Sequence, residues 1–423
     1  MTAAIINRPT ADYIRAHRHD DVRLLALHPS ATPDVDMTAA LQQIAGWQTA
    51  CRKLPSWAAV EGIVYPARLS MEQCSGERAA RYKQSVVRRL TAVSDRDSMY
   101  DLTGGAGVDF SFIAPLFDHG CYVERQERLC DIARHNMPLL GVGNARFVCA
   151  DAADCLRSID HAALIFLDPA RRDVAGRRTY AISDCTPDIL SMKDLLLGKA
   201  DMVMVKLSPM LDISKTVDDL NGNGSGVVSE LHIVAVNNEC KELLAVLSAD
   251  NTSPVRVFCV NGDDVFSFSR SENITAMRDV KDLSPTLSCG MYLYEPDASV
   301  MKAGCFALLC RRFGVMMTDR NSHLFVSERL ADGFPGRKFR ITAVSTMNRK
   351  ELKTALCGIT KANISVRNFP LTAAQLRSRL RLSDGGDTYI FATTAAGRHV
   401  VIIASKLTPF PSSRKTDQSL SVR

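Results

Sequence analysis

The sequence contains no apolar run long enough to cross a membrane. Its longest apolar stretches, such as His399–Ser405 and Cys305–Cys310, are far shorter than the roughly 20 residues that a spanning helix needs. Charge also enters at Arg8, before any stretch that resembles the apolar segment of a signal peptide. We therefore expect a cytoplasmic protein with no membrane partner.

Metal-binding and disulfide signatures are also missing. The 13 cysteines are scattered singly, and no two of them form a C-x-x-C pair. The nine histidines show no metal-ligand spacing, and no Ser-His-Asp or Cys-His combination indicates a nucleophilic enzyme. Buried free thiols in a reducing compartment account for the cysteines, so we expect neither a metal site nor a disulfide framework.

The overall composition is typical of a folded protein. The chain has 423 residues, which at about 150 residues per domain predicts roughly two to four domains. Hydrophobic residues make up 46% and charged residues 23% of the chain. These values exclude a mostly disordered, collagen-like or coiled-coil protein.

The net charge of +6 is unevenly distributed along the chain. Residues Pro335–Arg423 carry 16 Lys and Arg against 4 Asp and Glu, a net of +12, so the first 334 residues carry −6. A basic C-terminal part on an acidic body indicates a polyanionic partner, of which nucleic acid is the usual example.

The first 95 residues predict a helical region. Asp36 is placed to cap a segment whose apolar residues Leu41, Ile44 and Ala45 share one face of a helix. A second, strongly charged helix is predicted over Met71–Val93. Within it, the charged stretch Glu72–Lys83 fits a surface helix and a lid over a bound cofactor equally well.

After the helical region, short apolar runs alternate with amphipathic segments. The runs MYDLT, CYVER, ARFVC, ALIFLD, DMVMVK, ELHIVAV and VRVFCV predict strands. The segments between them predict helices over Glu127–Met137, Pro187–Leu197 and Asn238–Leu247. An Asn-Gly-Asp-Asp turn predicts a hairpin between Val255–Val260 and Phe266–Arg270. Apolar strands joined by helices are typical of a doubly wound α/β domain with a parallel sheet.

The remaining residues predict two small α+β units. Residues 288–330 form a strand–helix–strand stretch. From Phe339 the chain predicts strand, helix, strand, helix and two further strands, and this unit carries most of the positive charge. Its helices are expected over Asn348–Cys357, with Gly358 as C-cap, and over Thr372–Leu382. We expect the Ser-, Pro- and Lys-rich tail that follows to be frayed.

A glycine-rich loop follows the first predicted strand and opens a helix. Its candidate ligand-binding residues are Asp101, Thr103, Gly104, Gly105, Gly107 and Asp109. Glycines there let backbone N–H groups approach a ligand at the carboxyl end of a sheet. A dinucleotide requires G-x-G-x-x-G, but Phe110 occupies the third glycine position and acidic residues flank the loop. A ligand with a cationic centre and no phosphate, such as S-adenosyl-L-methionine (SAM), fits better.

Carboxylates at the ends of the next three strands support this ligand. Glu124 ends the second strand, where it can accept hydrogen bonds from both ribose hydroxyls. Asp151 follows the third strand, placed to accept a hydrogen bond from the adenine amino group. Asp168 and Pro169 end the fourth strand, beside the methyl group. Matches at four successive strand ends predict a SAM site.

In these four segments the sequence resembles class I SAM-dependent methyltransferases. More narrowly, DPARR at 168–172, KLSP at 206–209, EQCSGERAARYK at 72–83 and YLYEPD at 292–297 resemble a bacterial methyltransferase family with a THUMP-like C-terminal domain. The resemblance implies a Rossmann-like, doubly wound methyltransferase sheet with small ferredoxin-like and THUMP-like α+β domains after it. THUMP domains bind RNA, usually tRNA, so the resemblance also implies methyl transfer to structured RNA such as tRNA or rRNA.

The same resemblance divides the chain into five parts. We expect an N-terminal helical region (1–95), a methyltransferase domain (96–275), a ferredoxin-like segment (276–334), a THUMP-like basic domain (335–407) and a flexible tail (408–423).

Methyltransferases that act on exocyclic base amines commonly carry Asn/Asp-Pro-Pro-aromatic at the end of the fourth strand. The side-chain oxygen and a backbone carbonyl accept hydrogen bonds from the amine, and the ring stacks on the base. This chain keeps Asp168 and Pro169, which we expect to be catalytic, but has Ala170 and Arg171 afterwards. Arg171 can stack its guanidinium on a base, and Tyr180 can supply a ring. An exocyclic amine is therefore the favoured acceptor.

Basic side chains predict the contacts with substrate. The expected substrate-binding residues are Arg171, Arg172, Arg177, Arg178 and Tyr180 near the methyl site, Lys206 at the end of the fifth strand, and Arg377 and Arg379 in the C-terminal unit. Two other hypotheses stay open: a non-catalytic protein that binds SAM and RNA, and a methyltransferase that acts on protein. The sequence gives no indication of the oligomeric state.

Overall fold

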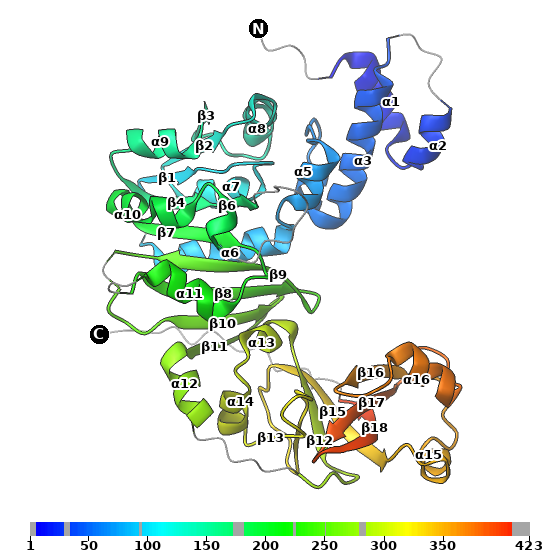
Figure 1. The fold of residues 1–423 in the computed structure, drawn as a ribbon. Coiled ribbons are helices and arrows are strands. Elements are labelled where there is room, and N and C mark those ends of the chain that lie inside the picture. Colours follow the sequence, from blue (N-terminus) through cyan, green and yellow to red (C-terminus); the bar gives the residue numbers. More distant parts are fainter. Residues whose placement is uncertain are drawn as a thin grey trace, which may run out of the picture. The chain divides into compact units, whose positions relative to one another are not determined.

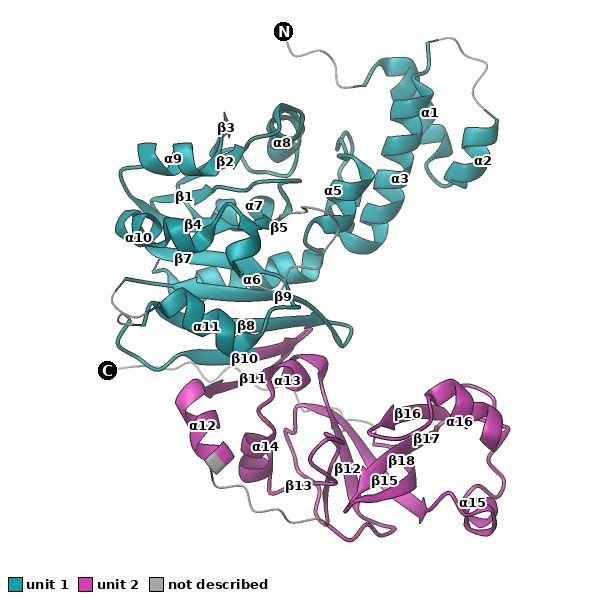
Figure 2. Ribbon diagram, viewed as in Figure 1, with its two compact units in different colours: residues 1–258 teal, residues 259–423 magenta. Residues whose placement is uncertain are grey.

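The computed structural model describes residues 6–28, 34–92, 95–171, 182–222, 226–249, 251–278 and 285–407. The chain divides into two compact units, unit 1 (Met1–Phe258) and unit 2 (Cys259–Arg423), which Figure 2 distinguishes by colour. None of the described helices is long and apolar enough to span a membrane.

The N-terminal region is helical, as predicted. Its helices are α1 (Arg8–His17), α2 (Val22–Leu27), α3 (Met37–Lys53), α4 (Pro55–Ala58), α5 (Arg68–Gln73) and α6 (Glu77–Leu90) (Figure 1). Asp36 caps α3, because its Oδ1 accepts a hydrogen bond from the Ala39 N–H at 3.0 Å. The prediction of a single helix over Met71–Val93 is wrong. The segment is divided between α5 and α6, because Cys74 and Gly76 have extended backbone angles.

A nine-stranded sheet begins in unit 1, and its last strand in chain order belongs to unit 2. With one exception, described below, its strands lie where the sequence predicted them. The strands are β1 (Ser98–Asp101), β2 (His119–Glu124), β3 (Ala145–Cys149), β4 (Ala162–Leu167), β7 (Ala200–Leu207), β8 (Val228–Val236), β9 (Glu239–Leu247), β10 (Arg256–Asn261) and β11 (Asp264–Ser269). Their order is β11-β10-β8-β9-β7-β4-β1-β2-β3, and the strands from β7 to β3 pair in parallel. The unit boundary falls within β10. The prediction of an α/β domain is confirmed, and the predicted parallel sheet is found in the five strands from β7 to β3, whereas β9 pairs antiparallel with both of its neighbours.

Helices follow the parallel strands and complete this alternation. They are α7 (Val108–Ile113), α8 (Glu127–Leu139), α9 (Ala152–Ser158), α10 (Ile189–Lys199) and α11 (Ile213–Asn221). A short antiparallel pair, β5 (Ala170–Arg171) with β6 (Cys185–Thr186), extends from the end of β4. The buried core combines sheet residues such as Leu164 and Met204 with helix residues such as Phe110 and Val86.

One predicted helix of unit 1 is a strand. The prediction of a helix over Asn238–Leu247 is wrong, because this segment forms β9. Asn237 and Asn238 have φ angles of 53° and 60°, and the turn that they make joins β8 and β9 into an antiparallel hairpin. β9 lies between β8 and β7, and its last six residues are buried. The apolar run Leu243–Leu247 is too short for its periodicity to distinguish a buried strand from a buried helix.

Unit 2 contains the predicted small α+β elements. They are α12 (Arg270–Arg278), β12 (Tyr292–Pro296), α13 (Ala298–Ala303), α14 (Phe306–Phe313), β13 (Met316–Met317), β14 (Phe325–Ser327), β15 (Gly336–Ser345), α15 (Arg349–Ala355), β16 (Asn363–Arg367), α16 (Ala373–Leu380), β17 (Thr388–Ala395) and β18 (Arg398–Lys406). Seven of these strands form one sheet in the order β13-β14-β12-β15-β18-β17-β16. Its core joins Leu293 of β12 to Phe339 and Phe391. The two small units expected from the sequence therefore share one sheet and one core.

Candidate functional site

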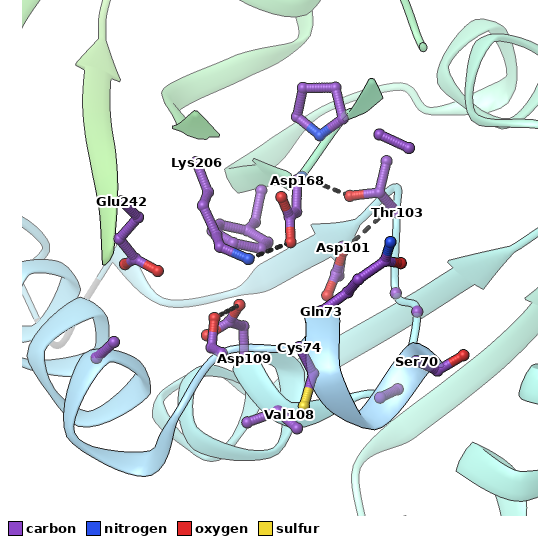
Figure 3. A pocket seen from close by; sticks show the side chains of 18 of the residues that line it. Ser70, Gln73, Cys74, Asp101, Thr103, Val108, Asp109, Asp168, Lys206 and Glu242 are labelled. Atoms are coloured by element: carbon purple, nitrogen blue, oxygen red, sulfur yellow. Dashed lines mark hydrogen bonds and ion pairs between the residues drawn. The ribbon is translucent and has the colours of Figure 1, made fainter. Parts of the chain in front are cut away.

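A cavity of about 1640 Å³ lies at the carboxyl ends of the parallel strands of unit 1 (Figure 3). Residues that follow β1, β2, β3, β4 and β7 line it. The turn between α5 and α6 forms another part of the wall, where Gln73, Cys74 and Ser75 line the cavity. The charged N-terminal segment, for which the sequence left a surface helix and a lid open, therefore contributes directly to the candidate site.

The glycine loop forms the floor of the cavity next to β1. A Cβ atom on Gly104 would lie 2.2 Å from a ring carbon of Tyr122, and one on Gly107 would lie 2.5 Å from Met137 Cε. Gly105 has a φ of 55°, and the nearest atom to a Cβ there would be 3.7 Å away. The loop is thus packed closely against Tyr122 on one side and stays open at Gly105.

Glu124 and Asp151 lie at the predicted strand ends and line the cavity. Glu124 Oε2 accepts a hydrogen bond from the Gly105 N–H at 3.0 Å, and Oε1 accepts one from the Gln126 N–H at 2.9 Å. These bonds fix the orientation of the carboxylate, and each oxygen keeps a further lone pair for a ligand. Asp151 is exposed and caps α9, accepting a hydrogen bond from the Ala153 N–H at 2.8 Å.

Thr103 connects the glycine loop to the end of β4. Its backbone N–H donates to Asp101 Oδ1 at 3.1 Å, and its Oγ1 accepts a hydrogen bond from the Asp168 N–H at 2.5 Å. Asp101 is only 1% exposed. Burial raises the pKa of Asp101 well above its usual value, and the neighbouring carboxylates raise it further.

Asp168 forms an ion pair with Lys206 at the predicted methyl-transfer position. Lys206 Nζ donates a hydrogen bond to Asp168 Oδ2, and the two side chains are 12% and 36% exposed, respectively (Figure 3). Burial lowers the pKa of this lysine, but the carboxylates of Asp168, Asp109 and Glu242 outweigh burial and raise it. The pair therefore presents a fixed ammonium and a fixed carboxylate to the cavity. The sequence placed both residues at the site but did not anticipate their pairing.

A second buried lysine, Lys83 on α6, was missed by the sequence analysis. Its side chain is fully buried, pairs with Glu242 of β9, and lies 3.2 Å from Asp109 Oδ1. Lys83 also donates to Ser75 Oγ at 3.1 Å, and that hydroxyl donates to Asp109 Oδ2 at 2.7 Å. The only local signal for this cluster is a single carboxylate, Glu242, directly before the apolar run LLAVL. The cluster joins the N-terminal helical region to the wall of the cavity.

The chemistry of the cavity fits SAM. Asp109 lines the cavity, and its buried Oδ1 forms an ion pair with Lys83 but no aligned hydrogen bond. Carboxylates at successive strand ends match a ligand whose polar groups are a sulfonium, an ammonium, two ribose hydroxyls and an adenine amine. The same carboxylates would repel the diphosphate of a dinucleotide.

The remaining predicted site residues are placed as follows. Pro169 lines the cavity next to Asp168, and the backbone of Arg171 pairs with Cys185 in the β5–β6 hairpin. Arg172, Arg177, Arg178, Tyr180 and the side chain of Arg171 lie outside the described residues.

In unit 2, the two predicted arginines differ in their surroundings. Arg377 pairs with Asp384 at 2.5 Å and donates to the Ala362 carbonyl at 2.9 Å. Arg379 is exposed. Arg377 is therefore engaged within the fold, whereas Arg379 is accessible to a ligand.

The chain resembles known proteins over nearly its whole length. Residues 336–406 match a family model described as THUMP domain-like, and residues 292–335 match a ferredoxin-like domain. A protein from Porphyromonas gingivalis W83, solved as a candidate methyltransferase, is 32% identical, with a TM-score of 0.81 over 95% of this chain and 98% of that one. Two uncharacterised SAM-dependent methyltransferases, from Mycobacterium tuberculosis strains CDC 1551 and H37Rv, are each 23% identical over 322 residues, which cover 74% of this chain and 80% of theirs.

Proposed function

Because this chain belongs to the bacterial family of class I SAM-dependent methyltransferases with a THUMP-like C-terminal domain, we propose that it methylates structured RNA such as tRNA or rRNA. The Rossmann-like, doubly wound methyltransferase fold and the SAM cofactor that the resemblance implied are confirmed by this membership. The observation that carries the RNA proposal is the exposed basic surface of residues 336–406, here called the C-terminal module, in the same chain as the SAM cavity.

SAM supplies an electrophilic methyl group, so the protein has to hold the donor, position an acceptor and exclude water. We expect Glu124 to accept hydrogen bonds from the ribose hydroxyls and Asp151 to accept one from the adenine amine. We expect Asp109, which lines the cavity and whose Oδ1 lies 3.2 Å from Lys83 Nζ, to attract the ammonium of the amino acid end by its charge. These roles leave Asp168 for the acceptor.

Two kinds of acceptor suit the surroundings of Asp168. An exocyclic base amine is favoured by the Asp168-Pro169 sequence, because a carboxylate oxygen and a backbone carbonyl can accept its two N–H groups. A hydroxyl is favoured by the Lys206 ammonium, which can stabilise negative charge on the acceptor oxygen. An exocyclic amine needs no strong base, because its nitrogen can attack the positively charged methyl donor directly, whereas a hydroxyl also has to give up its proton.

The C-terminal module is suited to contact the phosphates of RNA. Nine of its basic residues are exposed: Arg340, Arg349, Lys350, Lys353, Lys361, Arg379, Arg381, Arg398 and Lys406. Cations at the surface contribute binding that is independent of sequence and that weakens with salt. The module therefore serves as a handle for RNA rather than as a reader of bases.

The test is methyl transfer from tritium-labelled SAM to cell extracts that lack this protein. The purified protein is incubated with total RNA and, separately, with total protein from cells without the gene. We expect label that nuclease removes and protease does not. Label that only protease removes would contradict the RNA proposal and indicate a protein acceptor. The non-catalytic alternative is disfavoured because the relatives are SAM-dependent methyltransferases.

A further inference from the structure

Lys206 places a positive charge at the point of the cavity where methyl transfer is expected. Its ammonium donates a hydrogen bond to Asp168, and Figure 3 shows the side chain directed at that carboxylate. The Lys206 side chain is 12% exposed and lines the cavity, so the ammonium is fixed and reachable. An acceptor group that contacts Asp168 therefore also meets this ammonium.

The neighbouring charges keep this arrangement in place. Lys83, which is fully buried, is paired directly with Glu242 and lies 3.2 Å from Asp109. These two carboxylates therefore act on Lys206 only at longer range, and the direct ion pair of Lys206 is with Asp168. Lys83 also joins α6 to β9, so its pairs fix the wall against which Lys206 lies.

An amine and a hydroxyl make opposite demands on a fixed ammonium. When a neutral amine accepts a methyl group, positive charge builds up on its nitrogen, and a nearby ammonium opposes that charge. When a hydroxyl accepts a methyl group it also loses its proton. The negative charge that develops on its oxygen is stabilised by an ammonium already in place. Lys206 therefore favours a hydroxyl.

The described wall of the cavity lacks an accessible aromatic ring, and the candidates for stacking on a base, the side chain of Arg171 and Tyr180, lie outside the described residues. Among the described residues that line it, Phe166 is the one aromatic side chain, and it is only 1% exposed. Enzymes that modify a flipped base hold it by stacking and by hydrogen bonds to its edge. Three exposed arginines that line the cavity, Arg52, Arg78 and Arg125, instead suit the phosphates on either side of a ribose. Lys53, Arg81 and Lys241 also line the cavity but are engaged by neighbouring carbonyl or carboxylate oxygens.

We propose that the acceptor is a ribose 2′-hydroxyl of RNA and that Lys206 and Asp168 are both catalytic, an inference that rests on the proposed methylation of RNA. The hydroxyl oxygen forms the bond to the methyl carbon, and the methyl–sulfur bond breaks with its electron pair left on sulfur. The hydroxyl proton passes to Asp168 and from there to water. Lys206 donates a hydrogen bond to the acceptor oxygen while its negative charge develops.

Alkaline digestion of the labelled RNA tests the acceptor with the unmodified protein. Alkali cleaves RNA only where the 2′-hydroxyl is free, so a 2′-O-methylated nucleotide stays joined to its 3′ neighbour. RNA from cells without the gene is labelled with tritiated SAM, digested with alkali and separated by size. We expect the label in dinucleotides. Label in single nucleotides would overturn the ribose acceptor and leave RNA methylation standing, whereas RNA without label would overturn both.

Substitutions of Lys206 test its role separately. Lys206→Met should lower transfer by at least ~100-fold while the affinity for S-adenosylhomocysteine, measured by calorimetry, stays unchanged. Lys206→Arg keeps the charge and should recover part of the transfer. The matched control is Lys215→Met on α11, which removes a 61% exposed lysine from an ion pair with Asp219. Full transfer by Lys206→Met would overturn the proposal.

Discussion

Two lysines at the cavity of unit 1 are buried against carboxylates, whereas many basic side chains of the C-terminal module face the solvent. Lys83 is fully buried and Lys206 is 12% exposed, and each is paired with an acidic residue. On α15, Arg349, Lys350 and Lys353 are all exposed. Buried pairs fix the geometry of a site, whereas exposed cations can exchange counterions for phosphates. We therefore expect the buried pairs to serve the chemistry of the cavity and the exposed cations to serve the binding of RNA.

The C-terminal module has its own charges with a structural role. Glu295 is only 5% exposed and pairs with both Arg337 and Arg367, the latter at 3.1 Å. Glu295 lies on β12, Arg337 on β15 and Arg367 on β16, so the two ion pairs hold these three strands together. The number of basic residues in the module therefore overstates the number available to a polyanionic ligand.

The largest effect is expected from removing the carboxylate at the methyl site. Asp168→Ala should lower methyl transfer by about 1,000-fold, because the acceptor loses its orienting oxygen and Lys206 loses its partner. SAM binding should persist, because the expected ligand contacts lie at β1, β2 and β3. Tritium transfer and calorimetry measure the two quantities. Asp201→Ala, which removes a 63% exposed carboxylate near the amino end of β7, is the control. Transfer that survives Asp168→Ala would show that the assigned role is wrong.

Salt should weaken RNA binding through the C-terminal module. If the module engages about six phosphates, RNA affinity should fall roughly a thousandfold between about 50 and 200 mM salt. Replacing Arg349, Lys350 and Lys353 together by Ala should reduce the slope of log affinity against log salt by about 2.7. Filter binding or fluorescence anisotropy measures the slope.

A matched triple variant in unit 1 separates this effect from general charge. The control substitutes three residues that are 47%, 67% and 61% exposed, Arg134, Arg157 and Lys215, by Ala. Its slope should stay close to that of the unmodified protein. If both triple variants reduce the salt slope equally, the C-terminal module contributes no more to RNA binding than the surface of unit 1.

A buried charge of unit 1 should contribute mainly to stability. Burial raises the pKa of Glu230, but hydrogen bonds from His232 and Arg89 outweigh burial and lower it from 4.5 to about 2. This contribution is present above pH 4.5 and is lost as the pH falls toward 2. Glu230→Gln should therefore lower the free energy of unfolding by about 3 kcal/mol at neutral pH, and by progressively less below pH 4.5.

Urea unfolding at neutral and acidic pH measures this difference. Glu239→Gln is the control, because Glu239 is 73% exposed in its ion pair with Lys241 at 2.6 Å. An exposed pair contributes about 0–1 kcal/mol. If both variants lower the free energy of unfolding equally at neutral pH, the buried Glu230 network is no more stabilising than an exposed ion pair.

The smallest effect is expected at the glycine loop, where no charge changes. A methyl group on Gly104 would overlap the ring of Tyr122, so Gly104→Ala should cost about 2 kcal/mol and weaken SAM binding roughly 30-fold. Gly143→Ala is the matched control, since a Cβ there meets nothing within 4 Å. Calorimetry with SAM measures both variants. Unchanged affinity in Gly104→Ala would mean that the loop position does not determine binding.

The sequence predicts best those parts of the site that local patterns determine. The glycine loop, Glu124, Asp151 and Asp168 all follow predicted strands, and parallel strands bring their carboxyl ends to one edge of the sheet. Their common location could therefore be predicted from strand order alone. Their individual roles in binding and transfer stay predictions.

The cluster around Lys83 could not be predicted in the same way. Lys83 and Glu242 are 159 positions apart, and they meet only because α6 packs against a strand that the sequence pattern predicted as a helix. The helix predicted over Met71–Val93 hid the same feature, since Ser75 reaches Asp109 only where the backbone is extended between α5 and α6. Long-range contacts of this kind depend on tertiary packing rather than on local periodicity.

Methylation of cellular RNA tests the account most directly. The methylated nucleosides of tRNA and rRNA are measured by mass spectrometry in cells without the gene. The same cells are then analysed after receiving either the unmodified gene or its Asp168→Ala variant. We predict that one methylated nucleoside is absent without the gene, returns with the unmodified gene and does not return with the variant. Identical methylated nucleosides in all three strains would contradict the account.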